Sequence, residues 1–374
     1  MWGRASPRSG KKREGTRLRV LVLGGTAFLG RHYVEAALER GHDVTLFNRG
    51  QTNPDLFPEV ERIRGDRNQD LSGLRGREWD AVFDPSAFVP RHVRSLAAVL
   101  EGRAGHYTMV SSISVYPLDQ ADKSETAPVI QLDDPATELV NENYGGLKAL
   151  CEQAADELMP GRVLNLRAGL IVGPHDPTNR FTYWPERVAR GGEVLAPGRA
   201  EARVQLIHAR DIAEWALEMA ARGGAGTFNT TGPEPPTTMG RVLETCVAVS
   251  RSGALLTWVD EDFLLEKEVG PWMEMPLWIP GHLGDLHNAP IGRALSEGLR
   301  FRPLEQTVAE TLAWERTRVE GRPQTDAGGR VRQRGGMAAE RERELLAAWH
   351  RGGGGGKGSA RPAAGGTSPH AHQK

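Results

Sequence analysis

The hydrophobic pattern of the chain begins abruptly after a polar, basic stretch at residues 1–17, which predicts a disordered arm. Leu18–Leu23 is almost wholly apolar, as expected of a strand that is buried on both faces of a sheet. Phe28–Arg40 follows with helical spacing and ends at Gly41, a residue type that commonly terminates helices. The chain therefore opens with a predicted strand–turn–helix unit.

The same alternation continues through the first half of the chain. Further strands are predicted at Val44–Phe47, Val60–Ile63, Trp79–Phe83, His106–Val110 and Val163–Leu166. Helices are predicted at Arg91–Leu100 and Glu142–Leu158. Strands and helices that alternate with short turns indicate an α/β fold, a doubly wound parallel sheet of the Rossmann type.

After Pro174 the alternation loosens, and a smaller α+β lobe is expected. Helices are predicted at Thr178–Arg190, Asp211–Ala221, Thr237–Val249 and Leu304–Trp314, with strands at Val204–Ile207 and Thr227–Asn229. Asp211 and Thr237 are the expected N-caps, because their side-chain oxygens can accept hydrogen bonds from the first turn.

The first predicted turn, Gly24-Gly25-Thr26-Ala27-Phe28-Leu29-Gly30, lies between a buried strand and a helix. In that context a glycine-rich turn favours binding of a dinucleotide pyrophosphate at the helix N-terminus. Gly24 would allow the tight turn, Gly25 and Ala27 would leave room for the pyrophosphate, and Gly30 would let the helix pack on the sheet. A purely structural glycine turn is the alternative.

The end of the second strand bears on the choice of cofactor. An acidic residue there would accept the ribose 2′-hydroxyl and repel a 2′-phosphate, but this chain has Asn48-Arg49-Gly50. Arg49 could pair with the phosphate through two hydrogen bonds. NADP(H) is therefore favoured and NAD(H) possible, with a solvated Arg49 as the alternative.

Tyr144 and Lys148 stand four residues apart, on one face of the helix predicted over 142–158. A neighbouring ammonium would lower the pKa of the phenol toward useful acid–base strength. Gly145 and Gly146 between them weaken the helix, which suggests that a nicotinamide ring or a substrate approaches there. Ser111, Ser112 and Ser114 stand at the end of the fifth strand, where a serine hydroxyl could orient a reacting oxygen. An accidental Tyr/Lys pair and ordinary turn serines are the alternatives.

A glycine turn, a serine at a strand end and Tyr-x-x-x-Lys, in this order, resemble the extended short-chain dehydrogenase/reductase superfamily, also called the NAD-dependent epimerase/dehydratase family. The resemblance runs from about residue 18 to about residue 316. It includes Asp66 of Gly65-Asp66, whose counterpart in the family contacts adenine. It also includes Leu166–Pro174 and Leu206–Ala213, which are similar to two further family segments. The opening turn and Phe47-Asn48-Arg49-Gly50 are similar to a reductase-like bacterial branch related to chloroplast stem-loop RNA-binding proteins.

The resemblance implies an NAD(P)-dependent oxidoreductase or epimerase acting on a carbonyl or secondary alcohol of a sugar nucleotide or small metabolite. Ser112, Tyr144 and Lys148 would be catalytic. The residues that would bind the cofactor are Gly24, Gly25, Thr26, Ala27, Phe28, Leu29, Gly30, Asn48, Arg49, Asp66, Tyr144 and Lys148. Dehydration is less favoured, because Ile113-Ser114 stands where dehydratases often carry Asp-Glu. The alternative is a dinucleotide-binding or RNA-associated protein without turnover.

These assignments divide the chain into a dinucleotide-binding domain at 18–173 and a mainly substrate-binding lobe at 174–320, with 204–231 returning to the first domain. Residues 321–374 are expected to be mostly disordered, with a short helix near 338–349.

Charge and composition narrow the choice of partners. The net charge of −1 is distributed as +5 on residues 1–17, +6 on 321–374 and −12 on the rest, which makes nucleic acid an unlikely partner for the folded part. No apolar run is long enough for a membrane span, and two cysteines without a spacing motif favour a reducing compartment. A small-molecule substrate and a cytoplasmic location are expected, and a homodimer is possible on family analogy.

Several other residues have weaker claims to a role. His282, Asp285 and His287 lack the spacing of a zinc site and are expected to be loop residues. Two roles are possible for a further group of residues, which could form a substrate lid or pack inside the second lobe: Trp272, Met273, Met275 and Trp278. Arg180 and Arg210 could meet a substrate phosphate or simply be solvated. Cys151 is expected to be a small buried hydrophobe.

Overall fold

The structure is a computed structural model that describes residues 17–318 and 334–353. Almost all of the predicted basic arm, together with residues 321–333 and 354–374 of the predicted tail, lies outside the described residues.

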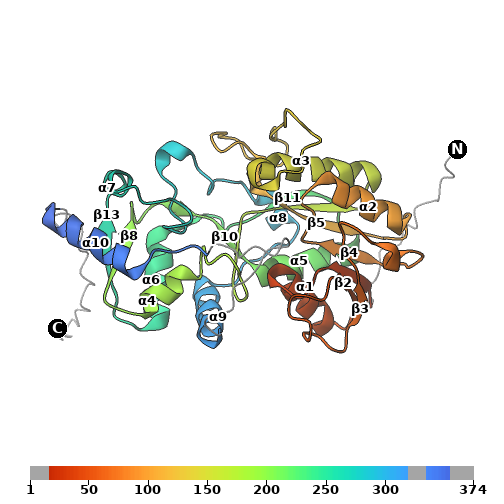
Figure 1. Cartoon of the computed structure of the whole chain (residues 1–374), viewed down its shortest axis with the longest axis horizontal. Helices are drawn as coiled ribbons and strands as arrows, with labels where there is room; N and C mark the ends of the chain where they lie inside the picture. Colours follow the sequence, from red (N-terminus) through yellow and green to blue (C-terminus); the bar gives the residue numbers. More distant parts are fainter. Residues whose placement is uncertain (1–16, 319–333, 354–374) are drawn as a thin grey trace, which may run out of the picture.

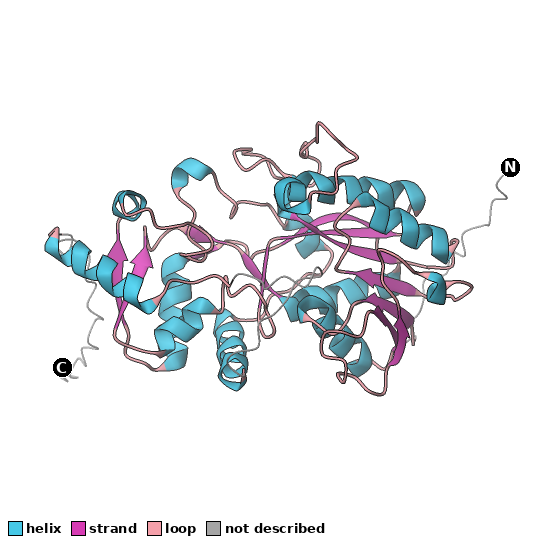
Figure 2. Cartoon of the chain, in the orientation of Figure 1, coloured by secondary structure: helices cyan, strands magenta, loops and turns pink. Residues whose placement is uncertain are grey.

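A parallel sheet of seven strands forms one half of the molecule, in the order β11-β6-β5-β4-β1-β2-β3 (Figure 2). Its strands are β1 (Arg19–Leu23), β2 (Asp43–Asn48), β3 (Glu61–Arg64), β4 (Ala81–Asp84), β5 (Tyr107–Ser112), β6 (Val163–Ala168) and β11 (Gly226–Thr230). The predicted Rossmann-type sheet is confirmed. Because β1 lies between β2 and β4, the strand order reverses beside β1, and ligands of such sheets bind outside the carboxyl ends of the strands at this point.

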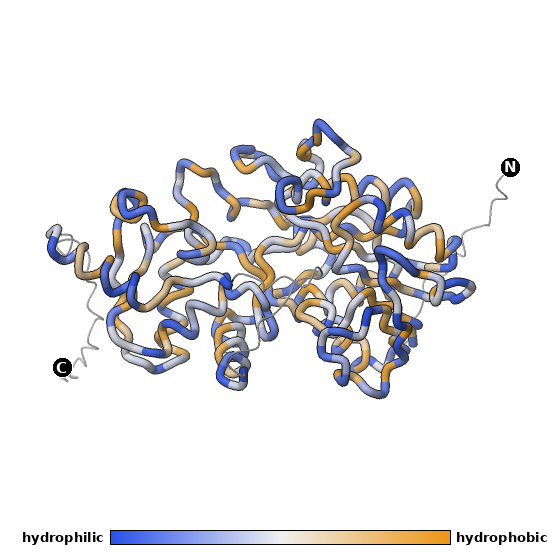
Figure 3. The backbone as a smooth tube through the Cα atoms, viewed as in Figure 1, coloured by the Kyte–Doolittle hydropathy of each residue, from blue (hydrophilic) through white to orange (hydrophobic). Residues whose placement is uncertain are grey.

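Two pairs of helices cover the two faces of this sheet. On one face α1 (Phe28–Glu39) packs against α5 (Ala209–Arg222), and on the other α2 (Pro90–Leu100) packs against α3 (Val140–Leu158) (Figure 1). Each helix pair closes a separate hydrophobic core over the strands. Hydrophobic stretches gather inside the molecule and hydrophilic stretches follow its outer loops (Figure 3).

The other half of the molecule is built on a third hydrophobic core. Its helices are α4 (Tyr183–Ala189), α6 (Met239–Ser250), α7 (Glu261–Glu266), α9 (Leu304–Thr317) and α10 (Ala339–Arg351), and α8 (Gly292–Ser296) lies beside β11. Short strand pairs complete this half: β7 (Leu170–Val172) with β10 (Leu206–His208), β8 (Glu193–Pro197) with β13 (Leu255–Val259), and β9 (Arg203–Val204) with β12 (Thr237–Thr238). Single turns of 3-10 helix are η1 (Ser72–Leu74), η2 (Ile113–Val115) and η3 (Gly281–Leu283).

The last described helix, α10, packs on this third core. Leu345, Leu346 and Trp349 are buried, and the Arg187 guanidinium donates to Glu342. The predicted short helix is therefore present, but it is an integral part of the second half of the molecule.

Three predicted helix starts are wrong. The helix predicted from Thr178 begins at Tyr183, because Asn179 has a left-handed backbone with φ of 62°. The helix α5 begins at Ala209, so His208, not Asp211, is its N-cap and accepts from the Arg210 amide.

Similarly, the N-cap of α6 is Thr238, one residue after the predicted Thr237, and its hydroxyl accepts from the Arg241 amide. The strand predicted over Val204–Ile207 is divided at Gln205, whose amide donates to His287.

No helix within the described ranges is long and apolar enough to cross a membrane.

Candidate active site

The glycine-rich turn leaves the start of α1 open to an anion. Gly24 has φ of 105°, and a Cβ placed there would find no atom within 4 Å. The N-cap of α1 is Ala27, which makes no side-chain capping bond, and the first turn of the helix contains no acidic residue. The free amides and the helix dipole therefore point toward this space without a competing carboxylate, as a pyrophosphate site requires.

Gly25 and Gly30 serve close packing inside the turn. A Cβ on Gly25 would lie 2.5 Å from Leu46 and 3.1 Å from Val34, so Gly25 is required by the chain's own core. This corrects the expectation that Gly25 only leaves room for a ligand. A Cβ on Gly30 would lie 3.0 Å from the Gly25 nitrogen, in agreement with the expected close helix packing.

The end of β2 is joined to the glycine turn by amide side chains. Asn48 Nδ2 donates to the Gly24 carbonyl at 2.7 Å, and its Oδ1 accepts from the Gly50 amide at 3.0 Å. Asn53 Nδ2 donates to the Thr26 carbonyl at 2.8 Å. Arg49, between Asn48 and Gly50 in the chain, is exposed. The strand end therefore presents a cation and no acidic side chain beside the turn.

Asp66 stands at the end of β3, in the turn that follows it. Its Oδ1 accepts from the Asn68 amide at 2.9 Å, which stabilises this turn. The next residue, Arg67, reaches across to the end of β4 and forms two hydrogen bonds with Asp84, at 2.7 and 2.8 Å. Burial alone would raise the pKa of Asp84, but the Arg67 charge and its hydrogen bonds hold that pKa at about 2. Sequence reasoning missed this buried pair, because nothing local links the two residues.

Ser112 and Tyr144 come together at the carboxyl edge of the sheet. Ser112 is the buried last residue of β5, and its Oγ accepts from the Ser114 amide at 3.1 Å. Tyr144 follows a break in α3 at Asn143, whose φ and ψ are −124° and 21°. The Ser112 hydroxyl lies close enough to the Tyr144 phenol to favour its ionised form and so to lower its pKa. Two residues of the predicted catalytic set therefore meet.

The protonation of Tyr144 differs from the prediction. The residue is 36% exposed overall, yet the protein surrounds its phenol closely enough that loss of hydration raises its pKa. The Ser112 hydroxyl and the positive charge of Arg180 act in the opposite direction without overcoming desolvation. The expected lowering of the Tyr144 pKa by Lys148 is therefore wrong for this structure, and Arg180 is the cation that acts on the phenol.

Lys148 is buried beneath the site. Its Nζ donates to the carbonyl oxygens of Ala87, after β4, and Val110, in β5, at 2.6 and 2.5 Å. It also lies 5.3 Å from the centre of the Phe88 ring. Burial lowers the pKa of this ammonium. Lys148 joins the ends of two neighbouring strands at the edge where the cofactor of such a sheet binds.

The two glycines that follow Tyr144 accommodate the chain itself. A Cβ on Gly145 would lie 2.0 Å from the Ser114 carbonyl oxygen, and one on Gly146 would lie 2.3 Å from the Leu132 side chain. The expectation that a ligand approaches the helix here is therefore wrong. The glycines let α3 pack against the turn that carries Ser112.

A buried polar network lies behind Ser112. The Ser111 hydroxyl donates to Glu152 on α3, and the Arg167 guanidinium forms an ion pair with Glu152 at 2.8 Å. Arg167 also donates to the Tyr116 hydroxyl at 2.7 Å, and this hydroxyl donates to Asn229 at 2.9 Å. The network ties β5, β6, β11 and α3 together around the catalytic candidates. In the sequence, Arg167 stands out only as part of a segment that is similar to the family.

The weaker candidates have structural partners. Asp285 pairs with Arg203 at 2.6 Å, and His287 accepts from the Gln205 amide at 2.9 Å. No cluster of three potential metal ligands occurs among residues 17–318 and 334–353. Cys151 is buried, and desolvation raises the pKa of its thiol to about 12.

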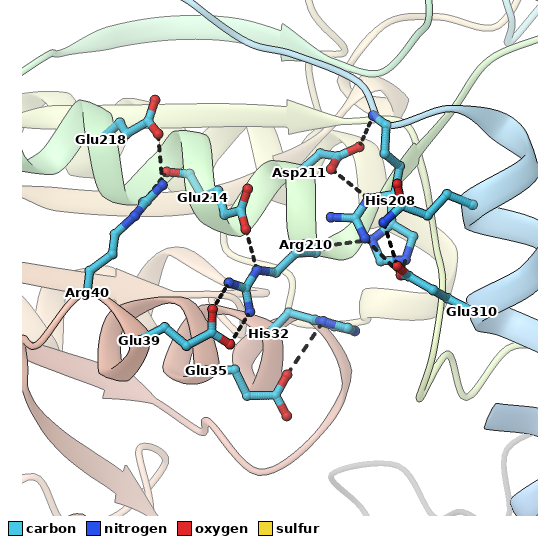
Figure 4. A network of polar contacts seen from close by, with 12 residues as sticks. His32, Glu35, Glu39, Arg40, His208, Arg210, Asp211, Glu214, Glu218 and Glu310 are labelled. Atoms are coloured by element: carbon cyan, nitrogen blue, oxygen red, sulfur yellow. Dashed lines mark hydrogen bonds and ion pairs between the residues drawn. The ribbon is translucent and has the colours of Figure 1, made fainter. Parts of the chain in front are cut away.

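Arg210 belongs to a polar network between α1 and α5. It forms ion pairs with Glu39 of α1 and, at 2.5 Å, with Glu214 of α5 (Figure 4). It therefore serves helix packing.

The chain matches the model of a known protein family. The model of the NAD dependent epimerase/dehydratase family matches residues 20–85 and 82–230, more than half of the chain. The chain belongs to this family. The matched residues include the glycine turn, Ser112, Tyr144 and Lys148.

Relatives of this epimerase/dehydratase family member include the chloroplast stem-loop binding protein of 41 kDa b of Arabidopsis thaliana. It is 25% identical over 239 residues, which are 57% of this chain and 58% of that protein. A 3 beta-hydroxysteroid dehydrogenase/Delta 5-->4-isomerase of Mycobacterium tuberculosis is 33% identical over 72 residues, 19% of this chain and 20% of that protein. The matched regions therefore cover less than two thirds of the length of each of these two relatives.

Solved structures share the fold across most of the chain. UDP-glucose 4-epimerase of Thermotoga maritima, in complex with UDP-glucose, has a TM-score of 0.60 at 17% identity, covering 80% of this chain and 99% of its own. UDP-glucose 4-epimerase of Thermus thermophilus, in complex with NAD, has a TM-score of 0.59 at 19% identity. The match covers 80% of this chain and 100% of that structure's chain.

Proposed function

We propose that this protein is an NAD(P)-dependent oxidoreductase or epimerase that acts on a carbonyl group or a secondary alcohol. The observation that carries the proposal is the proximity of Ser112 and Tyr144, at the sheet edge that also presents the open glycine turn. An anion cradle and a neighbouring Ser and Tyr at one edge suit a reaction that moves a hydride and a proton together.

A nicotinamide dinucleotide supplies or accepts the hydride when it is bound. The residues of the glycine turn and the start of α1 would hold its pyrophosphate, and Asp66, Asn48 and Arg49 its adenosine side. Lys148 would hold ribose hydroxyls, since its Nζ already lies between the ends of β4 and β5.

Tyr144 would move the proton. When a carbonyl is reduced, the phenol gives its proton to the substrate oxygen, and when an alcohol is oxidised, the phenolate takes the proton back. Ser112 orients that oxygen through its hydroxyl. Because desolvation raises the Tyr144 pKa, the phenol holds its proton at neutral pH and is set to donate.

NADP(H) is the cofactor that the end of β2 favours, although the solved structure from Thermus thermophilus contains NAD. No acidic side chain at positions 48–50 would repel a 2′-phosphate, and Arg49 is exposed beside the turn. An arginine suits this phosphate because its planar guanidinium can make two charge-assisted hydrogen bonds.

The substrate class is a sugar nucleotide or a small metabolite. The likeness to UDP-glucose 4-epimerases supports the first of these. Net reduction or oxidation consumes the dinucleotide, whereas epimerisation returns the hydride to the same substrate. Ile113 and Ser114 offer no carboxylate next to Ser112, so dehydration is less favoured.

A second candidate is a protein of this fold that binds RNA without turnover. The Arabidopsis relative, whose name describes stem-loop binding, favours it. The net charge of −12 on residues 18–320 speaks against it, since binding to a phosphate backbone needs a basic surface.

Substitution of Tyr144→Phe separates the two candidates. We expect this variant to lose turnover by about 10²–10⁴-fold, the usual contribution of a general acid–base group, while it still binds the dinucleotide. Turnover is followed by nicotinamide absorbance with a panel of carbonyl compounds and by epimerisation of UDP-sugars. Tyr33→Phe is the matched control, because the buried Tyr33 hydroxyl has no hydrogen-bond partner among the described residues. Full turnover in Tyr144→Phe would refute the proposed role.

A further inference from the structure

Arg180 lies on the segment that leads into α4. Its charge reaches the Tyr144 phenol strongly enough to act on the protonation of that group. It therefore belongs to the surroundings of the candidate proton donor, although it comes from the second half of the molecule.

The Arg180 guanidinium stacks on an indole ring. Its Cζ lies 5.1 Å from the centre of the Trp272 ring. Trp272 itself has a left-handed backbone, with φ of 66°, a conformation that costs energy in a residue with a side chain. Its amide donates to the Trp278 carbonyl at 3.1 Å, which holds the 272–278 loop closed.

The segment just before α10 also contacts this arrangement. The Gly335 amide donates to the Thr178 carbonyl at 2.8 Å, and the Gly336 amide donates to the Met273 carbonyl at 2.7 Å. A Cβ on Gly335 would lie 3.4 Å from Cγ of Arg180. The side chain of Arg180 is thus positioned by three separate segments, unlike a solvated arginine at a helix end.

The surroundings of Arg180 satisfy neither all of its hydrogen-bond donors nor its whole positive charge. Its Nε is buried and meets no hydrogen-bond acceptor within the described part of the chain. Loss of hydration lowers the pKa of the guanidinium, and the charge of Asp176 opposes this only in part. The Asp176 carboxylate already accepts from the Thr178 amide and hydroxyl, both at 2.8 Å. A buried donor without an acceptor is costly, and a positive charge that its surroundings offset only in part favours an anion beside the guanidinium.

We propose that Arg180, stacked on Trp272, binds an anionic group of the substrate, a carboxylate or a phosphate, close to the oxygen that reacts at Tyr144. This inference rests on the proposed function and deepens it. The substrate is then an anion whose charged group lies near its reactive carbonyl or alcohol. The planar guanidinium can donate two parallel hydrogen bonds to either group, while the indole holds its plane.

The test uses small probes that need no knowledge of the substrate. The full-length protein, with and without saturating NADPH, is titrated with acetate, inorganic phosphate or the neutral acetamide at constant ionic strength. The melting temperature reports binding, because only a ligand of the folded state raises it. We expect acetate or phosphate to raise it and acetamide to have no effect. Whichever anion acts more strongly identifies a carboxylate or a phosphate as the group that is bound.

Variants assign the effect to Arg180. Arg180→Gln should raise the dissociation constant of the active anion by about tenfold or more, as expected for loss of a charged hydrogen-bond donor. Arg180→Lys keeps the charge without the planar stack, so it should bind with intermediate affinity. Arg190→Gln is the control, because Arg190 is an exposed arginine just after α4, and this variant should bind like the wild type.

The outcomes separate this inference from the proposed function. An anion effect that is absent, shared by acetamide, or unchanged in Arg180→Gln would overturn the inference. Arg180→Lys provides the same comparison if Arg180→Gln does not fold. The proposed function fails instead if neither dinucleotide binds, or if Tyr144→Phe keeps full turnover, whatever the anions do.

Discussion

At the scale of single residues, the contacts of Tyr144 decide what the site can do. Its hydroxyl lies near Ser112 and desolvation raises its pKa, whereas Lys148 donates to two backbone carbonyls. The phenol is therefore a better proton donor than proton acceptor in this structure. Its position depends on Gly145, because only a glycine lets α3 approach the Ser114 carbonyl oxygen.

Gly145→Ala should destabilise the protein by about 1–3 kcal/mol, the usual cost of overpacking, because the new Cβ would lie 2.0 Å from a backbone oxygen. Urea unfolding measures this change through the transition midpoint. Gly292→Ala is the control: its Cβ would meet open space, and it should be neutral or slightly stabilising. Equal midpoints for the two variants would contradict the packing described for α3.

At the scale of elements, polar contacts join α1, α5 and α9 (Figure 4). Arg40 of α1 pairs with Glu218 of α5 at 2.8 Å. His208, the N-cap of α5, lies 3.2 Å from Glu310 of α9, and its ring centre is 5.6 Å from that of His32 on α1. The helices of the sheet half are thus attached to a helix of the second half through a buried histidine.

Protonation of this histidine should weaken folding in acid. The side chain of His208 is 1% exposed, and burial together with the charges of Arg302, His32 and Arg210 lowers its pKa to about 2. An unfolded histidine titrates near pH 6.5, so below that value the unfolded state binds more protons than the folded state. Stability should therefore be full above about pH 6.5 and fall below it, by up to about 1.4 kcal/mol per pH unit for this residue.

Urea unfolding between about pH 7 and about pH 5 measures this slope. His208→Asn keeps a side chain suited to the N-cap but removes the titrating group, so its slope should be smaller than that of the wild type. Parallel slopes for the two proteins would show that His208 is not responsible.

At the scale of the whole molecule, the sequence predicts those elements that the local spacing of hydrophobic and polar residues determines. Periodicity alone predicted the strands and helices of the first half, since buried strands and amphipathic helices leave a direct trace in the sequence. The glycine turn, Ser112 and Tyr144 could be proposed as site residues from the sequence, because their order along the chain resembles that of the family.

Contacts between distant segments were not predictable in this way. The Arg67–Asp84 pair, the stacking of Arg180 on Trp272 and the packing of α10 depend on tertiary structure, which no local pattern reports. The role of Gly145 was misassigned for the same reason, because its neighbour is a turn some thirty residues earlier in the chain.

The central claim is that the glycine turn binds a nicotinamide dinucleotide, with Arg49 favouring NADP(H). The most direct test is a thermal shift of the wild type and of Arg49→Gln with NADPH and with NADH. For the wild type we expect both dinucleotides to raise the melting temperature, NADPH at the lower concentration, since a ligand at 100 times its Kd adds about 2.7 kcal/mol. Arg49→Gln should lose the preference for NADPH and keep its response to NADH. A wild-type protein that shows no shift with either dinucleotide would contradict the account.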